Sequence, residues 1–228
     1  MNILKGLIPE IKLALPEILK LRSQKTKKED DSYVSEGDLL VDRMVIDFVK
    51  KNYPSVVVIT EETYTASTID VHATEFVAIV DPIDGTENFI SGLREWGIGV
   101  CIYHNGIFEE ALIGLPELDQ YVHSDDDIDK VFDSRIYGIS SSLTKEDLLA
   151  LESGFEYRII GCCMYNMFNV IRGSFKQFQN PKGAKSWDIL PGLNIALKNG
   201  LEVIVDNKPY HGEFLQATER YRFCIKNL

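Results

Sequence analysis

Near the middle of the chain, an apolar segment runs directly into two carboxylates and a hydroxyl, in the sequence DPIDGTENF at residues 81–89. Residues 76–80 (FVAIV) are typical of a buried strand, so we expect an acidic turn at the carboxyl end of that strand. A proline that fixes one backbone angle and a glycine that is free to adopt unusual ones allow Asp81 and Asp84 to converge on one point. Converging carboxylates need a cation. An ordinary Pro-Gly turn explains these residues equally well, so the rest of the chain must decide.

A second acidic pair follows a second predicted strand. Residues 56–59 (VVVI) are apolar and β-branched, and they lead straight into Glu61 and Glu62. Adjacent glutamates are usually surface charges, but carboxylates at the ends of two neighbouring strands can share one cavity. The sequence alone does not say whether residues 56–59 and 76–80 form neighbouring strands.

Two further carboxylates stand at the starts of predicted helices. Asp38 belongs to the segment SEGD at residues 35–38, which opens an amphipathic helix. Its spacing from Ser35 is that of a capping box, so Asp38 is either a helix cap or a site residue. Asp188 lies in the first turn of a later helix, where a capping or helix-dipole role is a simpler explanation than metal binding.

The remaining segments predict an alternation of helices and strands. We expect helices over residues 3–22 and 144–151, and another that follows Gly161-Cys162-Cys163 and runs through residue 172. Strands are expected at residues 97–103, 107–115, 135–140, 157–160, 201–205 and 221–225. The charged runs at 25–31 and 125–129 are expected to be solvated loops. The second run is no EF-hand, because a calcium loop that starts at Asp125 would lack its glycine and its final glutamate.

Composition limits the kinds of partner. The chain has 24 Lys and Arg against 35 Asp and Glu, a net charge of −11, so we expect neither a nucleic-acid duplex nor a membrane surface as partner. A small phosphorylated metabolite remains compatible, because bound metal ions invert the local charge. The four cysteines show no CxxC spacing, and no signal peptide or long apolar span is visible. We therefore expect a reduced, cytoplasmic protein.

Taken together, the acidic positions resemble those of the inositol monophosphatase superfamily of magnesium-dependent, lithium-sensitive phosphatases. The resemblance is carried by Glu61-Glu62, by DPIDGT with Asn88-Phe89, and by Trp187-Asp188 ahead of a helix. It extends to residues 28–38 (KEDDSYVSEGD), which look like the family's segment Lys-x-Asp-x-Ser-x-Val-Thr-x-Ala-Asp. The resemblance implies an α+β fold of alternating helix and sheet layers, with mixed, mostly antiparallel sheets. It also implies a single domain over residues 1–228, with two subdomains at about 1–135 and 136–228.

The resemblance further implies which residues bind metal. Glu61, Asp81 and the backbone carbonyl of Ile83 would hold one magnesium ion, which places Glu61 among the catalytic residues. Asp81, Asp84 and Asp188 would hold a second ion, with Asp81 shared between the two. Magnesium prefers oxygen ligands, and two metal ions that share a carboxylate suit the in-line displacement of a phosphate.

The resemblance assigns the remaining roles around these ions. Asp38 and Thr86 would orient and deprotonate the attacking water, and the amides of Gly85 and Thr86 would cradle the phosphate. The alcohol part of the substrate would contact Gly161, Cys162 and Cys163. A third, weaker ion would lie near Glu61, with Glu62 as its adjacent ligand; Lys28 is a further accessory candidate.

We therefore predict a phosphomonoesterase that uses two or three magnesium ions to hydrolyse a small phosphorylated metabolite. Residues 28–38 favour 3′-phosphoadenosine 5′-phosphate, whereas residues 81–89 favour inositol monophosphate, and a sugar phosphate also fits. Residues 179–183 (QNPKG) carry no carboxylate where inositol-specific members place a glutamate. The alternative is a non-catalytic member of the superfamily that acts as an interaction or metal-binding protein. A homodimer is compatible with either function.

Overall fold

The structure is a computed structural model that describes residues 2–29, 31–65, 67–130 and 133–227. Asp30, which belongs to the charged run at 25–31, lies outside the described residues. The helical elements are η1 (Ile3–Gly6), α1 (Leu7–Leu21), α2 (Glu36–Asn52), α3 (Thr86–Ile90), η2 (Pro116–Leu118), α4 (Lys145–Leu149), α5 (Cys163–Ile171) and α6 (Ser186–Lys198). The strands are β1 (Lys25–Lys27), β2 (Tyr33–Ser35), β3 (Val57–Thr60), β4 (Phe76–Asp84), β5 (Gly97–His104), β6 (Ile107–Leu115), β7 (Gln120–His123), β8 (Ile136–Ile139), β9 (Glu156–Ile159), β10 (Gln177–Ala184), β11 (Glu202–Val205), β12 (Lys208–Pro209) and β13 (Tyr221–Lys226).

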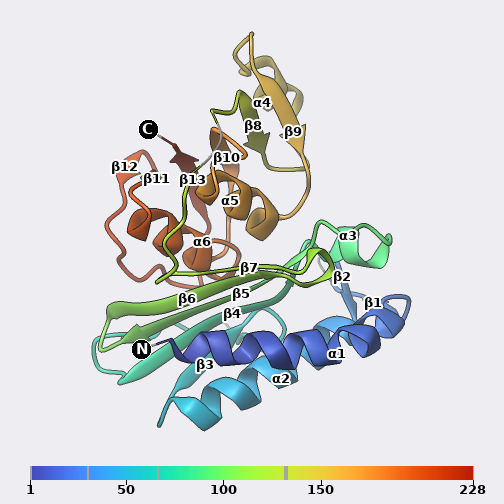
Figure 1. Cartoon of the computed structure of the whole chain (residues 1–228), viewed down its shortest axis with the longest axis vertical. Helices are drawn as coiled ribbons and strands as arrows, with labels where there is room; N and C mark the ends of the chain where they lie inside the picture. The colour runs from blue at the N-terminus through green and yellow to red at the C-terminus, as the bar shows by residue number, and fades with distance from the viewer. Residues whose placement is uncertain (1, 30, 66, 131–132, 228) are drawn as a thin grey trace.

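Helices and sheets alternate in layers (Figure 1). The helices α1 and α2 cover one face of a five-stranded sheet in the order β3-β4-β5-β6-β7. The helices α5 and α6 pack on its other face and separate it from a six-stranded sheet in the order β12-β11-β13-β10-β8-β9. Both sheets are mixed, with most neighbouring strands antiparallel. The expected layered α+β fold is confirmed.

Strand β4 is the central support of the site and is buried on both faces. Val77 and Ile79 pack into the core shared with α5 and α6, whereas Ala78 and Val80 pack against α1 and α2. This two-sided burial explains why the sequence of β4 is a continuous apolar run instead of an alternating one. The prediction of a buried strand at residues 76–80 is confirmed.

The segment that follows Val80 is not the expected turn. Strand β4 continues to Asp84, and its pairing with β5 contains a bulge between Asp81 and Asp84. Pro82 has no amide to donate to a neighbouring strand, and proline within a sheet is tolerated at bulges. The true turn comes at Gly85, whose φ of 81° ends the strand and starts α3.

Strand β10 was not predicted. Its sequence QFQNPKGA contains a proline, a glycine and several polar residues, so it lacks the pattern of a strand. It forms because β8 pairs with it in parallel on one side and β13 pairs with it in antiparallel on the other. The bulge between Asn180 and Ala184 accommodates its irregular end.

The charged run at residues 25–31 is only partly a loop, which corrects the prediction. Residues Lys25–Lys27 form β1, which pairs antiparallel with β2. All three residues are exposed, so β1 has no apolar face from which a periodic pattern could arise. The ribbon places Lys28 at its turn, where its side chain reaches Glu61 and Glu62.

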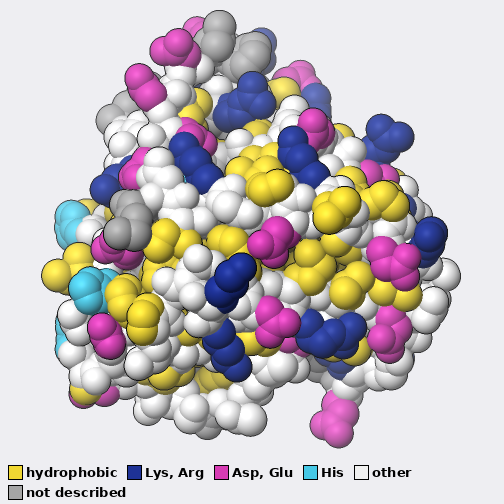
Figure 2. Space-filling view, turned by 60° about the horizontal axis from the view of Figure 1, so that its bottom comes forward, with side chains coloured by type: hydrophobic (Ala, Val, Ile, Leu, Met, Phe, Trp, Pro, Cys, Tyr) yellow, Lys and Arg dark blue, Asp and Glu magenta, His cyan; other side chains and the backbone are white. Residues whose placement is uncertain are grey.

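The surface carries mixed charges. On the face that Figure 2 shows, acidic and basic side chains are interspersed among apolar and uncharged ones. Among the helices that the structure describes, none has both the length and the apolar character needed to span a membrane.

Candidate metal centre and substrate pocket

Asp81 lies at the bulge of β4 and is fully buried. Neither of its carboxylate oxygens has a hydrogen-bond partner among the described residues. Burial raises the pKa of Asp81 well above its ordinary value, and the negative charges of Glu61, Asp84 and Asp188 raise it further. A buried carboxylate without a partner is strongly unfavourable unless a cation offsets its charge, so this position fits a bound metal ion.

Glu61 and Asp188 bring two more carboxylates to Asp81. One oxygen from each of the three residues lies within 4.8 Å of the other two. Because β3 is parallel to β4, with Thr60 beside Val80, the ends of the two strands place Glu61 next to Asp81. The two predicted strands are therefore neighbours, which the sequence alone left open. Three converging carboxylates match the oxygen ligands that magnesium prefers.

The first turn of α6 supplies Asp188. Its Oδ2 accepts a hydrogen bond of 2.8 Å from the backbone amide of Lys185, which caps the start of the helix. Burial, followed by the negative charges of Glu61 and Asp84, raises the pKa of Asp188 to about 8. Asp188 is thus a capping residue, as its position suggested, and also a member of the carboxylate cluster.

Asp84 lies beside these three carboxylates without joining their close group. Its Oδ2 accepts hydrogen bonds from the Cys162 thiol, at 3.0 Å, and from the backbone amide of Met164. Burial raises the pKa of Asp84 to about 7, although both hydrogen bonds act in the opposite direction. One Asp84 oxygen therefore ties β4 to the start of α5, an interaction that the sequence did not reveal.

Thr86 and Asp38 form a hydroxyl–carboxylate pair at the start of α3. The Thr86 hydroxyl lies 3.1 Å from Asp38 Oδ1 and 3.1 Å from the Ile83 carbonyl oxygen, and it can donate to either. Asp38 Oδ2 accepts from the backbone amide and hydroxyl of Ser35, as a capping box requires. Desolvation raises the pKa of the buried Asp38. Asp38 is therefore a helix cap, and its other oxygen pairs with the Thr86 hydroxyl.

Lys28 bridges the two glutamates that follow β3. Its Nζ lies 3.2 Å from Glu61 Oε1 and 2.9 Å from Glu62 Oε1. The Glu62 side chain is only 4% exposed, and burial raises its pKa to about 7 against the opposing effect of the hydrogen bond from Lys28. Lys28 and Glu62, the predicted accessory residues, thus meet at the edge of the carboxylate cluster, where Lys28 supplies one positive charge.

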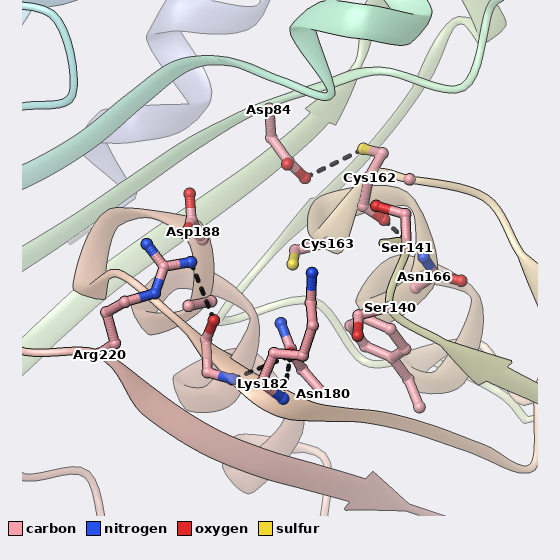
Figure 3. A pocket seen from close by; sticks show the side chains of 14 residues that line it. Asp84, Ser140, Ser141, Cys162, Cys163, Asn166, Asn180, Lys182, Asp188 and Arg220 are labelled. Atoms are coloured by element: carbon pink, nitrogen blue, oxygen red, sulfur yellow. Dashed lines mark hydrogen bonds between the residues drawn. The ribbon is translucent and has the colours of Figure 1, made fainter. Parts of the chain in front are cut away.

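A pocket of about 170 Å³ opens beside Asp84 and Asp188 (Figure 3). Gly161, Cys162 and Cys163 line it, at the start of α5, where the substrate's alcohol part was expected. The sequence did not indicate the other polar residues of its wall, which are Ser140, Ser141, Asn166, Asn180, Lys182 and Arg220. Asn180 and Lys182 lie on β10, which lacks a periodic pattern, whereas Asn166 lies on the predicted helix α5, where no motif marked it. The only sequence signal was that residues 179–183 depart from the inositol-specific pattern.

The layers, and the carboxylate cluster around the buried Asp81, define a layered α+β protein with a site suited to a divalent cation. A profile of the inositol monophosphatase family matches residues 1–127, which is more than half of the chain. The chain therefore belongs to the inositol monophosphatase family.

Solved structures share the fold over nearly the whole chain. Staphylococcal inositol monophosphatase-1, in an inhibitory complex soaked with LiCl, aligns with a TM-score of 0.83 and 18% identity, covering 98% of this chain and 88% of that one. An IMPase/NADP phosphatase complexed with Mg²⁺ and phosphate aligns with a TM-score of 0.80 and 18% identity, with the same coverage of the two chains. At this level of identity the likeness establishes the fold.

Curated relatives match shorter stretches. The putative Nus factor SuhB of Neisseria meningitidis is 31% identical over 90 residues, which is 40% of this chain and 33% of the relative. The fructose-1,6-bisphosphatase/inositol-1-monophosphatase of Thermotoga maritima is 24% identical over 183 residues, which is 73% of this chain and 69% of that protein. The match thus spans about a third of the first relative's length and about two thirds of the second's.

Proposed function

We propose that the protein is a magnesium-dependent phosphomonoesterase that hydrolyses a small phosphorylated metabolite. The observation that carries the proposal is the buried Asp81, whose two oxygens have no hydrogen-bond partner in the described part of the chain and one of which lies within 4.8 Å of carboxylate oxygens of Glu61 and Asp188. The Thr86–Asp38 pair next to this cluster offers a group that can accept a proton from water. Family membership supports the same activity.

The carboxylates are the proposed ligands of two magnesium ions. Glu61, Asp81 and the carbonyl of Ile83 would hold one ion, and Asp81, Asp84 and Asp188 would hold the other. Bound there, the ions would neutralise phosphate charge, lower the pKa of a water molecule and stabilise the leaving oxygen. Asp84 has one oxygen available for this role, because the other accepts the hydrogen bonds from α5.

A third, weaker ion would lie next to Glu61, with Glu62 as a ligand. Lys28 already supplies a positive charge at this point. We propose that the ammonium group of Lys28 must move away from Glu62 before such an ion binds.

Thr86 and Asp38 are the proposed pair that handles the attacking water. The Thr86 hydroxyl can donate its hydrogen to Asp38 Oδ1 and accept a hydrogen bond from the water with its lone pair. A proton lost by the water would pass by this route to Asp38. The raised pKa of the buried Asp38 suits a general base, because it makes the carboxylate a better proton acceptor near neutral pH.

The phosphate and the alcohol are proposed to bind on opposite sides of Gly85. The amides of Gly85 and Thr86 would donate to the phosphate oxygens. The wall formed by Gly161, Cys162 and Cys163 would contact the alcohol that leaves. A side chain on Gly85 would lie 2.9 Å from Cys162 Cβ, so glycine is needed where these two parts of the site meet.

A phosphate-release assay tests the proposal. Inositol 1-phosphate, fructose 1,6-bisphosphate, 3′-phosphoadenosine 5′-phosphate and NADP form the substrate panel, with magnesium or with EDTA. We expect magnesium-dependent release from at least one member, and a loss of turnover of about 100-fold in Asp84→Asn and Asp188→Asn. Asp47→Asn, an exposed carboxylate on α2, is the matched control. No release from any substrate would contradict the proposal.

The second candidate is a non-catalytic interaction protein. The observation that favours it is the match to relatives named Nus factor SuhB, at 31% identity over 90 residues. This candidate predicts a specific protein partner and no magnesium binding. Calorimetric detection of magnesium binding that Asp188→Asn abolishes would exclude it as the sole function.

We also make proposals about the subdomains, the location, the inhibition and the oligomeric state of the protein. We propose two subdomains, at about 1–135 and 136–228, and the two large sheets support this division. The last strand of the five-stranded sheet ends at His123, and the first strand of the six-stranded sheet begins at Ile136. A reduced, cytoplasmic location agrees with the four cysteines, all of which are free thiols. We further propose that lithium inhibits the enzyme and that the protein forms a homodimer.

A further inference from the structure

Two positively charged side chains line the pocket next to the carboxylate cluster. In Figure 3, Lys182 extends from β10 toward Cys163, and the guanidinium of Arg220 lies beside Asp188. Neither cation forms an ion pair within 4.0 Å with a carboxylate of the residues that the structure describes. In a chain with a net charge of −11, this pairing of cations in one cavity calls for an explanation.

The backbone of β10 is shaped to present these cations. The side-chain oxygen of the buried Asn180 accepts hydrogen bonds from the amides of Lys182, at 3.0 Å, and Gly183, at 3.1 Å. Gly183 adopts a φ of 87° and its carbonyl accepts a hydrogen bond of 3.0 Å from Arg220 Nη2. The guanidinium is therefore held in place by one of its donors while the others remain available to a ligand.

A third cation, Lys185, supports the segment before Arg220. The Nζ of Lys185 donates to the carbonyls of Ala217 and Thr218, at 3.1 Å and 3.0 Å. The ammonium group of Lys185 is thus held by the protein. The Nζ of Lys182, in contrast, forms no hydrogen bond with any residue that the structure describes. Lys185 therefore has a structural role, whereas Lys182 and Arg220 face the pocket.

A buried hydroxyl on the same wall also lacks a partner. Ser140 follows β8, is 8% exposed, and its Oγ forms no hydrogen bond with any described residue. A buried hydroxyl is normally satisfied, so an unpaired one that lines a pocket points to a ligand. A hydroxyl donor and two cations together match an oxyanion far better than they match an uncharged sugar or inositol ring.

We propose that the substrate carries a second phosphate, in addition to the one that is hydrolysed, and that Lys182 and Arg220 bind it. This inference rests on the proposed phosphatase function and names the class of its substrate. The scissile phosphate lies at the carboxylate cluster, and the second phosphate lies across the pocket beside β10. Bidentate recognition by Arg220, with Lys182 as a point charge, is the usual way in which proteins bind phosphate.

Matched substrate pairs test the inference without knowledge of the alcohol. The pairs are 3′-phosphoadenosine 5′-phosphate with adenosine 3′-phosphate, fructose 1,6-bisphosphate with fructose 1-phosphate, and inositol 1,4-bisphosphate with inositol 1-phosphate. Within the pair that the enzyme accepts, we expect kcat/KM to favour the bisphosphate by about tenfold or more at low salt. Added salt should reduce this ratio, because both cations are exposed at the rim.

Variants assign the preference to the two cations. Lys182→Met should lower the ratio by about threefold or more, and the double variant with Arg220→Met should bring it close to one. Lys182→Met is the cleaner of the two, since Arg220 lies beside Asp188. Arg222→Met is the matched control: it removes an exposed positive charge on β13, two residues from Arg220 and outside this pocket, and should leave the ratio unchanged.

The outcomes separate this inference from the proposed function. Equal rates for both members of every pair, or a ratio that survives in the double variant, would overturn the second-phosphate site while leaving the phosphatase intact. If no pair is hydrolysed, calorimetry with adenosine 5′-phosphate against adenosine, and with fructose 6-phosphate against fructose, decides the question. Tighter binding of a phosphate ester that Lys182→Met removes would keep the inference, whereas equal binding within both pairs would overturn it.

Discussion

At the scale of single residues, the environment of Asp81 predicts that removal of its charge stabilises the metal-free protein. Its ionised form is unfavourable in the metal-free protein, because both oxygens are buried and neither accepts a hydrogen bond from the residues that the structure describes. We expect Asp81→Asn to raise the stability of the metal-free protein by about 1–3 kcal/mol and to abolish the additional stability that magnesium confers on the wild type. Thermal denaturation with EDTA and with saturating magnesium measures both effects. An undiminished magnesium-induced rise in Tm would contradict the assignment of Asp81, and Asp47→Asn is the control.

The Thr86 hydroxyl has a separate role that a pair of substitutions can isolate. Thr86→Val removes the hydrogen bond to Asp38 but keeps the shape of the side chain, and we expect turnover to fall by about 10²–10⁴-fold. Thr86→Ser keeps the hydroxyl and should retain most of the activity. Magnesium binding, followed by calorimetry, should be the same in both variants. If the valine variant turns over as fast as the serine variant, the hydroxyl does not handle the attacking water.

The raised pKa values of the carboxylates predict how metal affinity depends on pH. Burial raises the pKa of Asp188 to about 8 and that of Asp84 to about 7, so the metal-free protein holds protons that the unfolded chain would release. The stability that these protons confer is therefore lost as the pH rises through these values. Because magnesium competes with the same protons, its affinity should increase between about pH 6 and about pH 9. Calorimetry in buffers of different ionisation enthalpy should detect proton release, and a pH-independent affinity would contradict the prediction.

At the scale of elements, a buried hydrogen-bond network joins the N-terminus to the five-stranded sheet. Glu110 on β6 accepts hydrogen bonds from the Leu4 amide, at 3.1 Å, from the Tyr53 hydroxyl and from the ring of His123, at 2.7 Å. Burial acts to raise the pKa of Glu110, but these hydrogen bonds outweigh it and lower the pKa below its ordinary value of 4.5. The network thus connects η1, the end of α2, β6 and β7.

This network makes Glu110 a determinant of stability. The contribution of its carboxylate is present above pH 4.5 and is lost as the pH falls through the lower folded-state pKa. We expect Glu110→Gln to destabilise the protein by about 1–3 kcal/mol at neutral pH, as measured by urea denaturation, and to flatten the loss of stability in acid. The exposed neighbour Glu109→Gln serves as the control. Equal stability of the two variants would show that the network contributes little.

Elements with a strong local pattern were predictable, and elements formed by distant pairing were not. The apolar run of β4 and the capping box of α2 were both visible in the sequence and both are present. Strand β10 escaped prediction because β8 and β13 create it by pairing, against the local preference of its proline and glycine. Strand β1 escaped prediction because all three of its residues are exposed, which leaves no hydrophobic period. Whether such segments form strands depends on the hydrogen bonds of the sheet more than on local propensity.

At the scale of the whole molecule, the sequence predicted the acidic half of the site better than the cationic half. Glu61 follows the end of β3, and Asp81 lies at the bulge of the adjacent parallel strand β4, so an expectation based on neighbouring strands brought them together. Lys182 and Arg220 lie 38 positions apart by their residue numbers and meet only because β10 pairs with β13. No local pattern marks such a pair, so the proposed second-phosphate site depends on the structure.

The central claim is that the carboxylates around Asp81 bind the magnesium on which phosphate release depends. The most direct test measures magnesium binding and phosphate release on the same samples of wild type and Asp81→Asn, across a magnesium titration. We predict that release in the wild type follows the occupancy of magnesium, stops in EDTA, and is lost together with metal binding in Asp81→Asn. Release that persists in EDTA, or in an Asp81→Asn protein that no longer binds magnesium, would contradict the account.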